Sequence, residues 1–299
     1  MLTKLLREEV VAKAPKGEKR DVEVAVALWI DLLGYGSMLE LALWDPTSAD
    51  AKRAMERIQV FQATVTQHSM RNFPSFVMND GAIAFRDLSP RSTVVSFDFL
   101  RRAIALFDAV NFADVALGCP GARAVLATGF RVRRFVDSGN RLNAGEGANI
   151  KEKLKLKKIS QDQAINHALM ARHHCDSTPE LQHNYAMTKA YLVESSGKAA
   201  GISGSRLYVD MALFKDGVPS WIVSQGPVVH WNGRGMGASF TPIGTIDIPA
   251  GARDHDQTMR DAYGVASILS ANPAIEKILR AGKVGNLRSS GKKASDYAT

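Results

Sequence analysis

Seven apolar residues run without interruption from Val24 to Ile30. A strand with one wet face alternates apolar and polar positions, whereas a continuous apolar run is typical of a strand buried on both faces. We therefore predict a central strand at this point of the chain. The run is followed directly by Asp31, so an ionisable carboxyl group stands at the end of the strand.

Two shorter apolar runs, 75–78 and 82–85, flank the sequence Asn79-Asp80-Gly81. An Asn-Gly or Asp-Gly signal between apolar runs favours a tight β-hairpin, because these residues adopt the backbone angles of the turn. The pattern predicts a hairpin with Asp80 at its tip.

Elsewhere in the first half, apolar residues recur at helical spacing. We predict helix over 39–71 with a break near Pro46, a second helix over 97–115, and a strand over 122–132. A strand, helices, a hairpin, a helix and a returning strand form the split βαβ arrangement of ferredoxin-like and palm-type domains. The expected fold class is therefore α/β (α+β), an antiparallel sheet with helices on one face.

The second half carries a weaker pattern. Residues 137–160 are rich in glycine, asparagine and lysine and are predicted to be an exposed loop or hairpin extension. From Trp221 the chain reads as irregular or short-stranded. The remaining elements are expected as helices at 161–175, from Asn184 and at 255–271, and as a strand at 206–214.

Four segments are expected along the chain: an N-terminal segment (1–20), a principal domain (21–215), a C-terminal extension packed on it (216–281) and a disordered basic tail (282–299). With 45% hydrophobic residues, the 299-residue chain can bury a sizeable core. The N-terminus is charged throughout and no apolar stretch approaches the ~20 residues of a membrane span, so a cytoplasmic protein is expected.

The formal net charge of +8 favours an anionic ligand. Basic residues fall into separate clusters, at 131–134, 151–158 and 280–293, rather than along one stripe interleaved with aromatic residues. This distribution favours a nucleotide over a nucleic acid as the partner. A nucleic-acid enzyme or binder on a related palm domain stays open as a third alternative.

Asp31 and Asp80 are 80 − 31 = 49 residues apart, yet a hairpin beside the first strand would bring them to one edge of the sheet. A buried carboxylate costs several kcal/mol, on the order of values for buried ions, unless a cation or hydrogen bonds compensate. Mg²⁺ takes one or two carboxylates plus substrate phosphates, and two-metal sites serve phosphoryl displacement. The alternative is that Asp31 caps the next helix and Asp80 is an ordinary turn residue.

The segment after the first aspartate contains Leu33-Gly34-Tyr35-Gly36. Its glycines allow a sharp turn, and the amides opening a helix near Met38 would attract phosphate oxygens. The segment lacks the Gly-Lys-Ser/Thr of a Walker motif. It predicts a phosphate-binding turn of another type.

The order and spacing of these motifs resemble the class III nucleotide cyclases, and more closely the Pycsar pyrimidine cyclases of bacterial antiphage defence. The resemblance covers roughly residues 20 to 215. The matching pieces are Trp29 to Tyr35, Asn79-Asp80-Gly81, Gly121-Ala122-Arg123, and residues 189–194 followed by 205–210.

This resemblance implies a homodimeric enzyme that converts a nucleoside triphosphate to its 3′,5′-cyclic monophosphate and pyrophosphate with two Mn²⁺ or Mg²⁺ ions. It also implies a downstream effector that senses the cyclic nucleotide, often a membrane protein. The implied roles are metal ligation by Asp31, Asp80 and the Leu32 carbonyl, phosphate binding by Leu33, Gly34, Tyr35 and Gly36, and phosphate binding or substrate orientation by Arg123. For Arg123, the alternative is an ordinary ion pair on a strand.

Two departures from the family pattern concern the substrate. The lysine with which adenylate cyclases recognise adenine is absent from residues 75–78, so a pyrimidine substrate is expected, UTP or alternatively CTP. The Asn-x₃-Arg pattern is also absent after Asn184, where Lys189 or Tyr191 could substitute. The alternatives are an amphipathic helix with Tyr191 half-buried, and a catalytically silent module that only binds nucleotide.

Overall fold

The computed structural model describes residues 21–133, 144–170, 181, 183–247, 255–272, 275 and 279. The chain divides into two compact units, one of 22–131 with 184–299 and the other of 1–21 with 132–183. The predicted N-terminal segment and basic tail lie outside the described residues. None of the described helices is long and apolar enough to cross a membrane.

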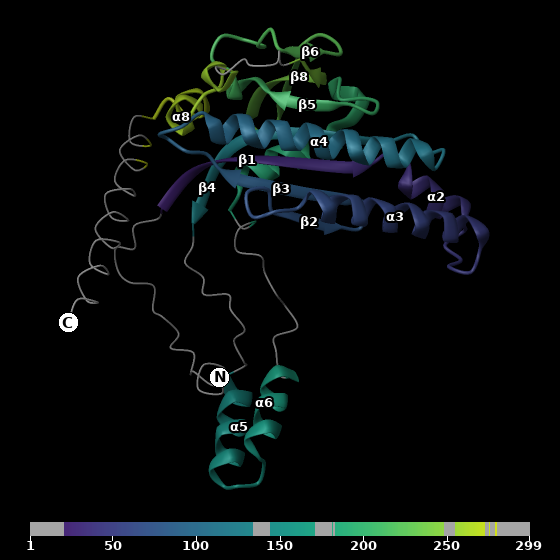
Figure 1. Cartoon of the computed structure of the whole chain (residues 1–299), viewed down its shortest axis with the longest axis vertical. Coiled ribbons are helices and arrows are strands. Elements are labelled where there is room, and N and C mark those ends of the chain that lie inside the picture. Colours follow the sequence, from purple (N-terminus) through teal and green to yellow (C-terminus); the bar gives the residue numbers. More distant parts are fainter. Residues whose placement is uncertain are drawn as a thin grey trace, which may run out of the picture. The chain divides into compact units, whose positions relative to one another are not determined.

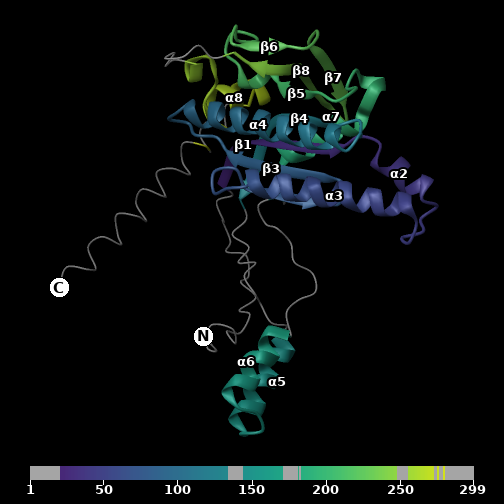
Figure 2. The ribbon, with the colours of Figure 1, turned by 45° about the vertical axis from the view of Figure 1, so that its right-hand side comes forward.

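The larger unit is an α/β structure built around one sheet, as Figures 1 and 2 show. Its strands are β1 (Asp21–Leu32), β2 (Ser75–Met78), β3 (Gly81–Asp87), β4 (Ala122–Arg133), β5 (Leu207–Asp210), β6 (Ile222–Ser224), β7 (Val229–Gly233) and β8 (Met236–Ile246). Its α-helices are α2 (Tyr35–Leu41), α3 (Ala49–His68), α4 (Val94–Ala116), α7 (Tyr185–Ser196) and α8 (Ala262–Leu269), with 3₁₀ turns at Gly197–Ala200, Met211–Leu213 and His255–Thr258.

The sheet has the order β2-β3-β1-β4-β5-β8-β6, and β7 pairs with β8. The pairs β1 with β3 and β5 with β8 are antiparallel, whereas β4 and β5 are parallel. The predicted α/β class with a mostly antiparallel sheet is confirmed. The predicted central strand is also confirmed, because β1 lies between β3 and β4 in the interior of the sheet.

Both faces of β1 are covered, which explains its uninterrupted apolar run. Leu28 and Ile30 share one hydrophobic cluster with Phe61 of α3 and Leu100 of α4. Side chains alternate between the faces of a strand, so Trp29 points to the opposite face. There its ring meets Tyr191 of α7 edge-on, with centroids 5.2 Å apart. Helices therefore cover both faces of the sheet, with α3 and α4 on one and α7 on the other. The predicted arrangement with helices on one face is wrong, because the central strand is apolar on both sides and each side needs a cover.

The smaller unit contradicts the predicted loop at 137–160, as far as it is described. Residues 144–155 form helix α5 (Ala144–Lys155), which packs against α6 (Gln161–Met170). Ile150 and Leu154 are four residues apart, the spacing of one helix face, and Ile150 is buried. The two glycines at the start of the segment obscured this short periodicity.

The prediction beyond Trp221 underestimated the regular structure. Residues 236–246 form the long strand β8, which pairs with β5, β6 and β7. Glycine and polar residues interrupt the apolar alternation of β8, so its sequence lacks a strand signal. The C-terminal part of the chain therefore completes the same sheet that β1 begins.

Candidate functional site

Asp31 and Asp80 lie side by side at one edge of the sheet. Asp31 pairs in register with Gly81 of β3. The next residue, Leu32, donates its backbone N–H to the carbonyl oxygen of Asp80 at 3.0 Å. Two aspartates from distant parts of the sequence therefore meet where β1 ends and the β2–β3 hairpin turns.

The hairpin turn has the chemistry that its sequence predicts. Asn79 takes a positive φ of 56°, and its side-chain amide donates to Asp80 Oδ1 at 3.0 Å. A Cβ at Gly81 would lie 2.8 Å from the ring of Trp29 and 3.4 Å from Asp31 Oδ1. Glycine at this position therefore lets the indole and the carboxylate lie closely over the hairpin.

The environment of Asp31 leaves its negative charge poorly compensated. The pKa of this carboxyl group is raised from 3.8 to about 7, first by burial and then by the nearby carboxylates of Glu194 and Asp80. The positive charges of Arg123 and Arg57 lower this pKa without offsetting the other effects. A bound cation would supply the missing compensation.

Glu194 belongs to this acidic group, although it was not among the predicted site residues. It lies on α7, and its Oε1 accepts hydrogen bonds from Arg123 Nε at 2.8 Å and from Nη2 at 2.5 Å. Arg123 is therefore an ion-pair partner, which is the alternative that the sequence left open. In the sequence, nothing indicated that Glu194 would reach the end of β1, because α7 is placed there by packing.

The turn after β1 agrees only in part with the predicted phosphate-binding segment. Gly34 has a φ of 72° and precedes α2, which begins at Tyr35 rather than near Met38. The amide of Leu33 already donates to the carbonyl oxygen of Gly121 at 2.9 Å. Because this N–H is already used, the amide of Leu33 is not available to bind a phosphate.

A buried arginine that the sequence analysis missed holds this turn. Arg57 of α3 donates from Nη2 to the Leu33 carbonyl oxygen at 2.9 Å and, from Nε and Nη2, to both carboxylate oxygens of Asp114 at 2.7 and 2.8 Å. Asp114 Oδ2 also accepts the amide N–H of Gly121 at 2.8 Å. The network connects α3, α4, the turn after β1 and the start of β4. In the sequence, Arg57 looks like an ordinary surface charge on a helix.

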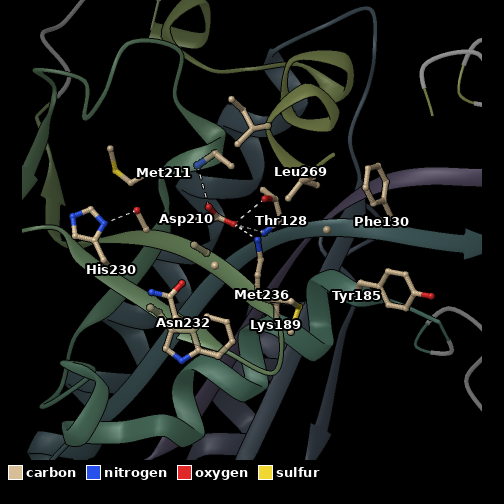
Figure 3. Close-up of a pocket in the computed structure, with 18 of the residues that line it drawn as sticks. Thr128, Phe130, Tyr185, Lys189, Asp210, Met211, His230, Asn232, Met236 and Leu269 are labelled. Carbon is tan, nitrogen blue, oxygen red and sulfur yellow. Dashed lines mark hydrogen bonds and ion pairs between the residues drawn. The ribbon is translucent and has the colours of Figure 1, made fainter. Parts of the chain in front are cut away.

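Lys189 and Tyr191, the two residues of α7 that could replace the absent Asn-x₃-Arg pattern, have different surroundings. Tyr191 is 48% exposed and contacts Trp29, next to the aspartates. Lys189 is buried and donates to Asp210 at 2.6 Å. Asp210 also binds Thr128, which is five residues beyond Arg123 on β4, or roughly 16 Å along the strand. Lys189 therefore lies apart from the aspartate pair, beside the pocket in Figure 3.

The indole of Trp29 has an unused polar group beside the aspartates. Its Nε1 is buried and has no hydrogen-bond partner among the residues that the structure describes. A buried donor left without a partner costs about 1–3 kcal/mol, so its presence is unusual in a structure of this kind.

The atoms that could bind a metal ion where β1 ends are mainly carboxylate oxygens. The described part of the chain contains no group of three or more His, Cys, Asp or Glu arranged to hold a metal ion. Two carboxylates fit Mg²⁺ or Mn²⁺, hard cations that bind oxygen and commonly complete their coordination with water and substrate phosphates. Asp31 and Asp80 therefore fit a cation shared with a phosphorylated substrate better than a closed protein cage.

No protein-family model matches this chain, and no curated protein matches it. Among solved structures, the chain is similar to the guanylyl cyclase Cya2, with 10% identity, a TM-score of 0.45, and coverage of 78% of this chain and 98% of that one. It is also similar to the adenylyl cyclase CyaB from P. aeruginosa, with 9% identity, a TM-score of 0.42, and coverage of 76% and 97%. A third similar structure is the guanylate cyclase domain of RhGC from Catenaria anguillulae in complex with GTP. It has 10% identity and a TM-score of 0.38, and the match covers 75% of this chain and 97% of that one.

Proposed function

We propose that this protein is a metal-dependent nucleotide cyclase. The observation that carries the proposal is the meeting of Asp31 and Asp80 at the end of β1, with a pKa of about 7 for Asp31. Two adjacent carboxylates with uncompensated charge suit divalent cations that also bind a triphosphate. The sequence resemblance to class III cyclases concerns the same two residues.

In the proposed reaction, the ribose 3′ oxygen forms a bond to the α-phosphorus of the substrate. The bond from that phosphorus to the bridging oxygen of the β-phosphate breaks, pyrophosphate leaves, and the hydroxyl proton is lost to solvent. Asp31, Asp80 and the Leu32 carbonyl would hold the cations, and bound cations would polarise the hydroxyl and stabilise the charge on the leaving group. The amides of Gly34, Tyr35 and Gly36 remain the proposed phosphate contacts.

The other polar groups near the aspartates have proposed supporting roles. Arg123, held by Glu194, keeps a positive charge beside Asp31 and would stabilise the phosphates electrostatically rather than by direct capture. Tyr191 is exposed enough to contact a substrate, whereas Lys189 is held by Asp210. We therefore retain only Tyr191 as a candidate contact to the base or the transition state.

For the substrate, we propose UTP, with CTP as the alternative. Phe76 and Phe85 stack on the β2–β3 hairpin with ring centroids 6.1 Å apart, where adenylate cyclases carry a lysine. An apolar surface offers no donor that selects adenine. The proposal extends to a homodimer in the cytoplasm whose cyclic UMP acts as a second messenger in antiphage defence through a separate sensing effector.

A second candidate function is a cyclase-like module that binds nucleotide without turning it over. The observation that favours it is helix α7, which carries no arginine and whose lysine is paired with Asp210. Such a module would keep the metal and triphosphate contacts at Asp31 and Asp80. It would lack a group to stabilise the transition state.

The test is incubation of the purified chain with Mn²⁺ and each of the four nucleoside triphosphates, with product analysis by chromatography and mass spectrometry. We expect cyclic UMP or cyclic CMP, abolished in Asp31→Asn and Asp80→Asn and unchanged in the exposed control Glu40→Gln. Formation of no cyclic product from any triphosphate would reject the enzyme. A melting temperature that rises with nucleotide and Mn²⁺, without product, would then support the binding module.

A further inference from the structure

A second site lies at the other end of α7. A pocket of about 710 Å³ opens there between β4, β5, α7, the β7–β8 hairpin and α8. Figure 3 shows Lys189 reaching from α7 toward Asp210 and Thr128, with His230 and Asn232 on another side. Small-molecule sites typically have volumes of about 300–1,000 Å³ and a few polar groups in an apolar wall. This pocket has the same size and composition.

Both carboxylate oxygens of Asp210, in this pocket, accept hydrogen bonds from the protein. Asp210 Oδ2 accepts the backbone N–H and the hydroxyl of Thr128, at 3.0 and 2.8 Å, and the Lys189 ammonium at 2.6 Å. Its Oδ1 accepts the amide of Ala212 at 3.0 Å. Four donors around one buried carboxylate leave it little capacity for a cation.

The ammonium group of Lys189, by contrast, has N–H donors that no described residue accepts. An ammonium group has three N–H donors, and among the described residues Lys189 Nζ has a hydrogen bond to Asp210 alone. Lys189 is only 6% exposed, so bulk water gives it little compensation. Donors in the wall of a pocket that are removed from water favour a ligand with acceptor oxygens.

Further cationic and polar groups line the same pocket. The guanidinium of Arg260 donates to the carbonyl oxygens of Ala212 and Lys215, at 3.3 and 2.7 Å, and no carboxylate among the described residues pairs with it. His230 forms a 2.8 Å hydrogen bond with the Ser239 hydroxyl. Among the described lining residues, Asp210 is the single acid, and Lys189 already offsets its charge. The wall therefore carries excess positive charge.

The rest of the wall is apolar, and its side chains share the ability to pack against a ring or a short aliphatic body. They are Phe130, Met211, Trp231, Met236, Ile268 and Leu269. We propose that this pocket binds a small organic anion, a ring-bearing phosphate or carboxylate held by Lys189 and Arg260. The proposal does not depend on the proposed cyclase activity, because none of its residues contacts the aspartate pair.

The experiment is calorimetric titration of the full chain with uridine 5′-monophosphate and with benzoate, which distinguish phosphate from carboxylate ligands. The neutral compounds uridine and benzamide are the matched probes. We expect one of the two anions to bind and both neutral compounds to fail. Binding of neither anion at millimolar concentration, or equal binding of a neutral probe, would overturn the proposal.

Variants locate the binding. Arg260→Met is expected to weaken binding at least about tenfold, the loss of one charge-assisted hydrogen bond. Arg234→Met removes the same charge from the exposed turn of the β7–β8 hairpin and is expected to leave binding unchanged. Asp31→Asn should also leave it unchanged. If Asp31→Asn abolishes binding and Arg260→Met does not, the anion binds at the aspartate site and the pocket proposal is wrong.

Discussion

The two ends of helix α7 carry buried charges in opposite conditions. At one end, Asp31 lies near the carboxylates of Glu194 and Asp80, and the pKa of Asp31 rises to about 7. At the other end, Asp210 is surrounded by four donors, and Lys189 has donors to spare. One end therefore suits a cation and the other an anion, although each contains an aspartate, half-buried at the first end and buried at the second.

The difference shows that the charge of an aspartate does not define its site. What decides is the number of donors that the fold brings to each carboxylate. Asp210 folds with its own compensating groups, so its charge is structural. Asp31 has fewer of them, and the pKa of its carboxyl group is raised to about 7. Four substitutions test this contrast, ordered from the largest expected effect on the free energy of unfolding.

Arg57→Met should have the largest effect. It leaves the carboxylate of Asp114, which is 4% exposed, without its cationic partner and frees the Leu33 carbonyl. Removing one partner of a buried ion pair costs about 3–5 kcal/mol. Urea unfolding measures the loss, and Arg53→Met, at an exposed position one turn earlier, is the control. A loss no larger than that of the control would show that the network does not support the turn.

Asp210→Asn should also destabilise the fold, by about 3 kcal/mol, because Lys189 is then a buried charge without a carboxylate. The measurement is again urea unfolding, with the exposed Asp216→Asn as the control. The effect is expected to be somewhat smaller than that of Arg57→Met, since asparagine at position 210 keeps an oxygen that can accept a hydrogen bond from Lys189. A stabilised variant would mean that Asp210 resembles Asp31 and would break the comparison.

Gly129→Ala tests the close packing of α7 on β4, which positions the residues at both ends of the helix. A Cβ at Gly129 would lie 2.4 Å from the backbone nitrogen of Ala186, in the first turn of the helix. Overpacking of this kind costs about 1–3 kcal/mol, and it should shift α7 away from the sheet. Gly36→Ala, which meets open space, is the matched control and should be neutral or slightly stabilising. Equal stability of the two variants would contradict the close packing of α7.

Asp31→Asn should have the smallest effect, and of the opposite sign. Because the pKa in the folded protein is about 7, above the ordinary 3.8, ionisation of Asp31 destabilises the fold as pH rises through this range. Without metal, the variant should melt a few degrees higher than the wild type at about pH 8. The difference should shrink toward about pH 4, where the wild-type carboxyl is protonated.

Thermal melting at several pH values measures this effect, and Mn²⁺ sharpens it. Added Mn²⁺ should raise the melting temperature of the wild type and leave Asp31→Asn unchanged, because a ligand stabilises only the protein that binds it. The exposed Glu40→Gln should follow the wild type in both respects. A variant that melts lower than the wild type at high pH would show that Asp31 is compensated after all.

Much of the fold could be predicted from local sequence. The apolar run before Asp31 predicted a strand covered on both faces, and Asn79-Asp80-Gly81 predicted the hairpin at the correct residues. Both signals depend on residues close together in the chain. The helix α5 and the strand β8 were missed, because glycine and polar residues interrupt their periodicity. The strand β8 also depends on pairing with β5, which lies well before it in the chain.

The sequence by itself determined that Asp31 ends a buried strand and that Asp80 lies at a hairpin tip. It could not determine which charges would be neutralised. Tertiary packing places Glu194 near Asp31, and it forms the ion pairs of Arg57 with Asp114 and of Lys189 with Asp210. The physical reason is that burial and donor contacts depend on segments that are far apart along the chain. Only the folded structure decides which carboxylate is compensated by its neighbours and which is not.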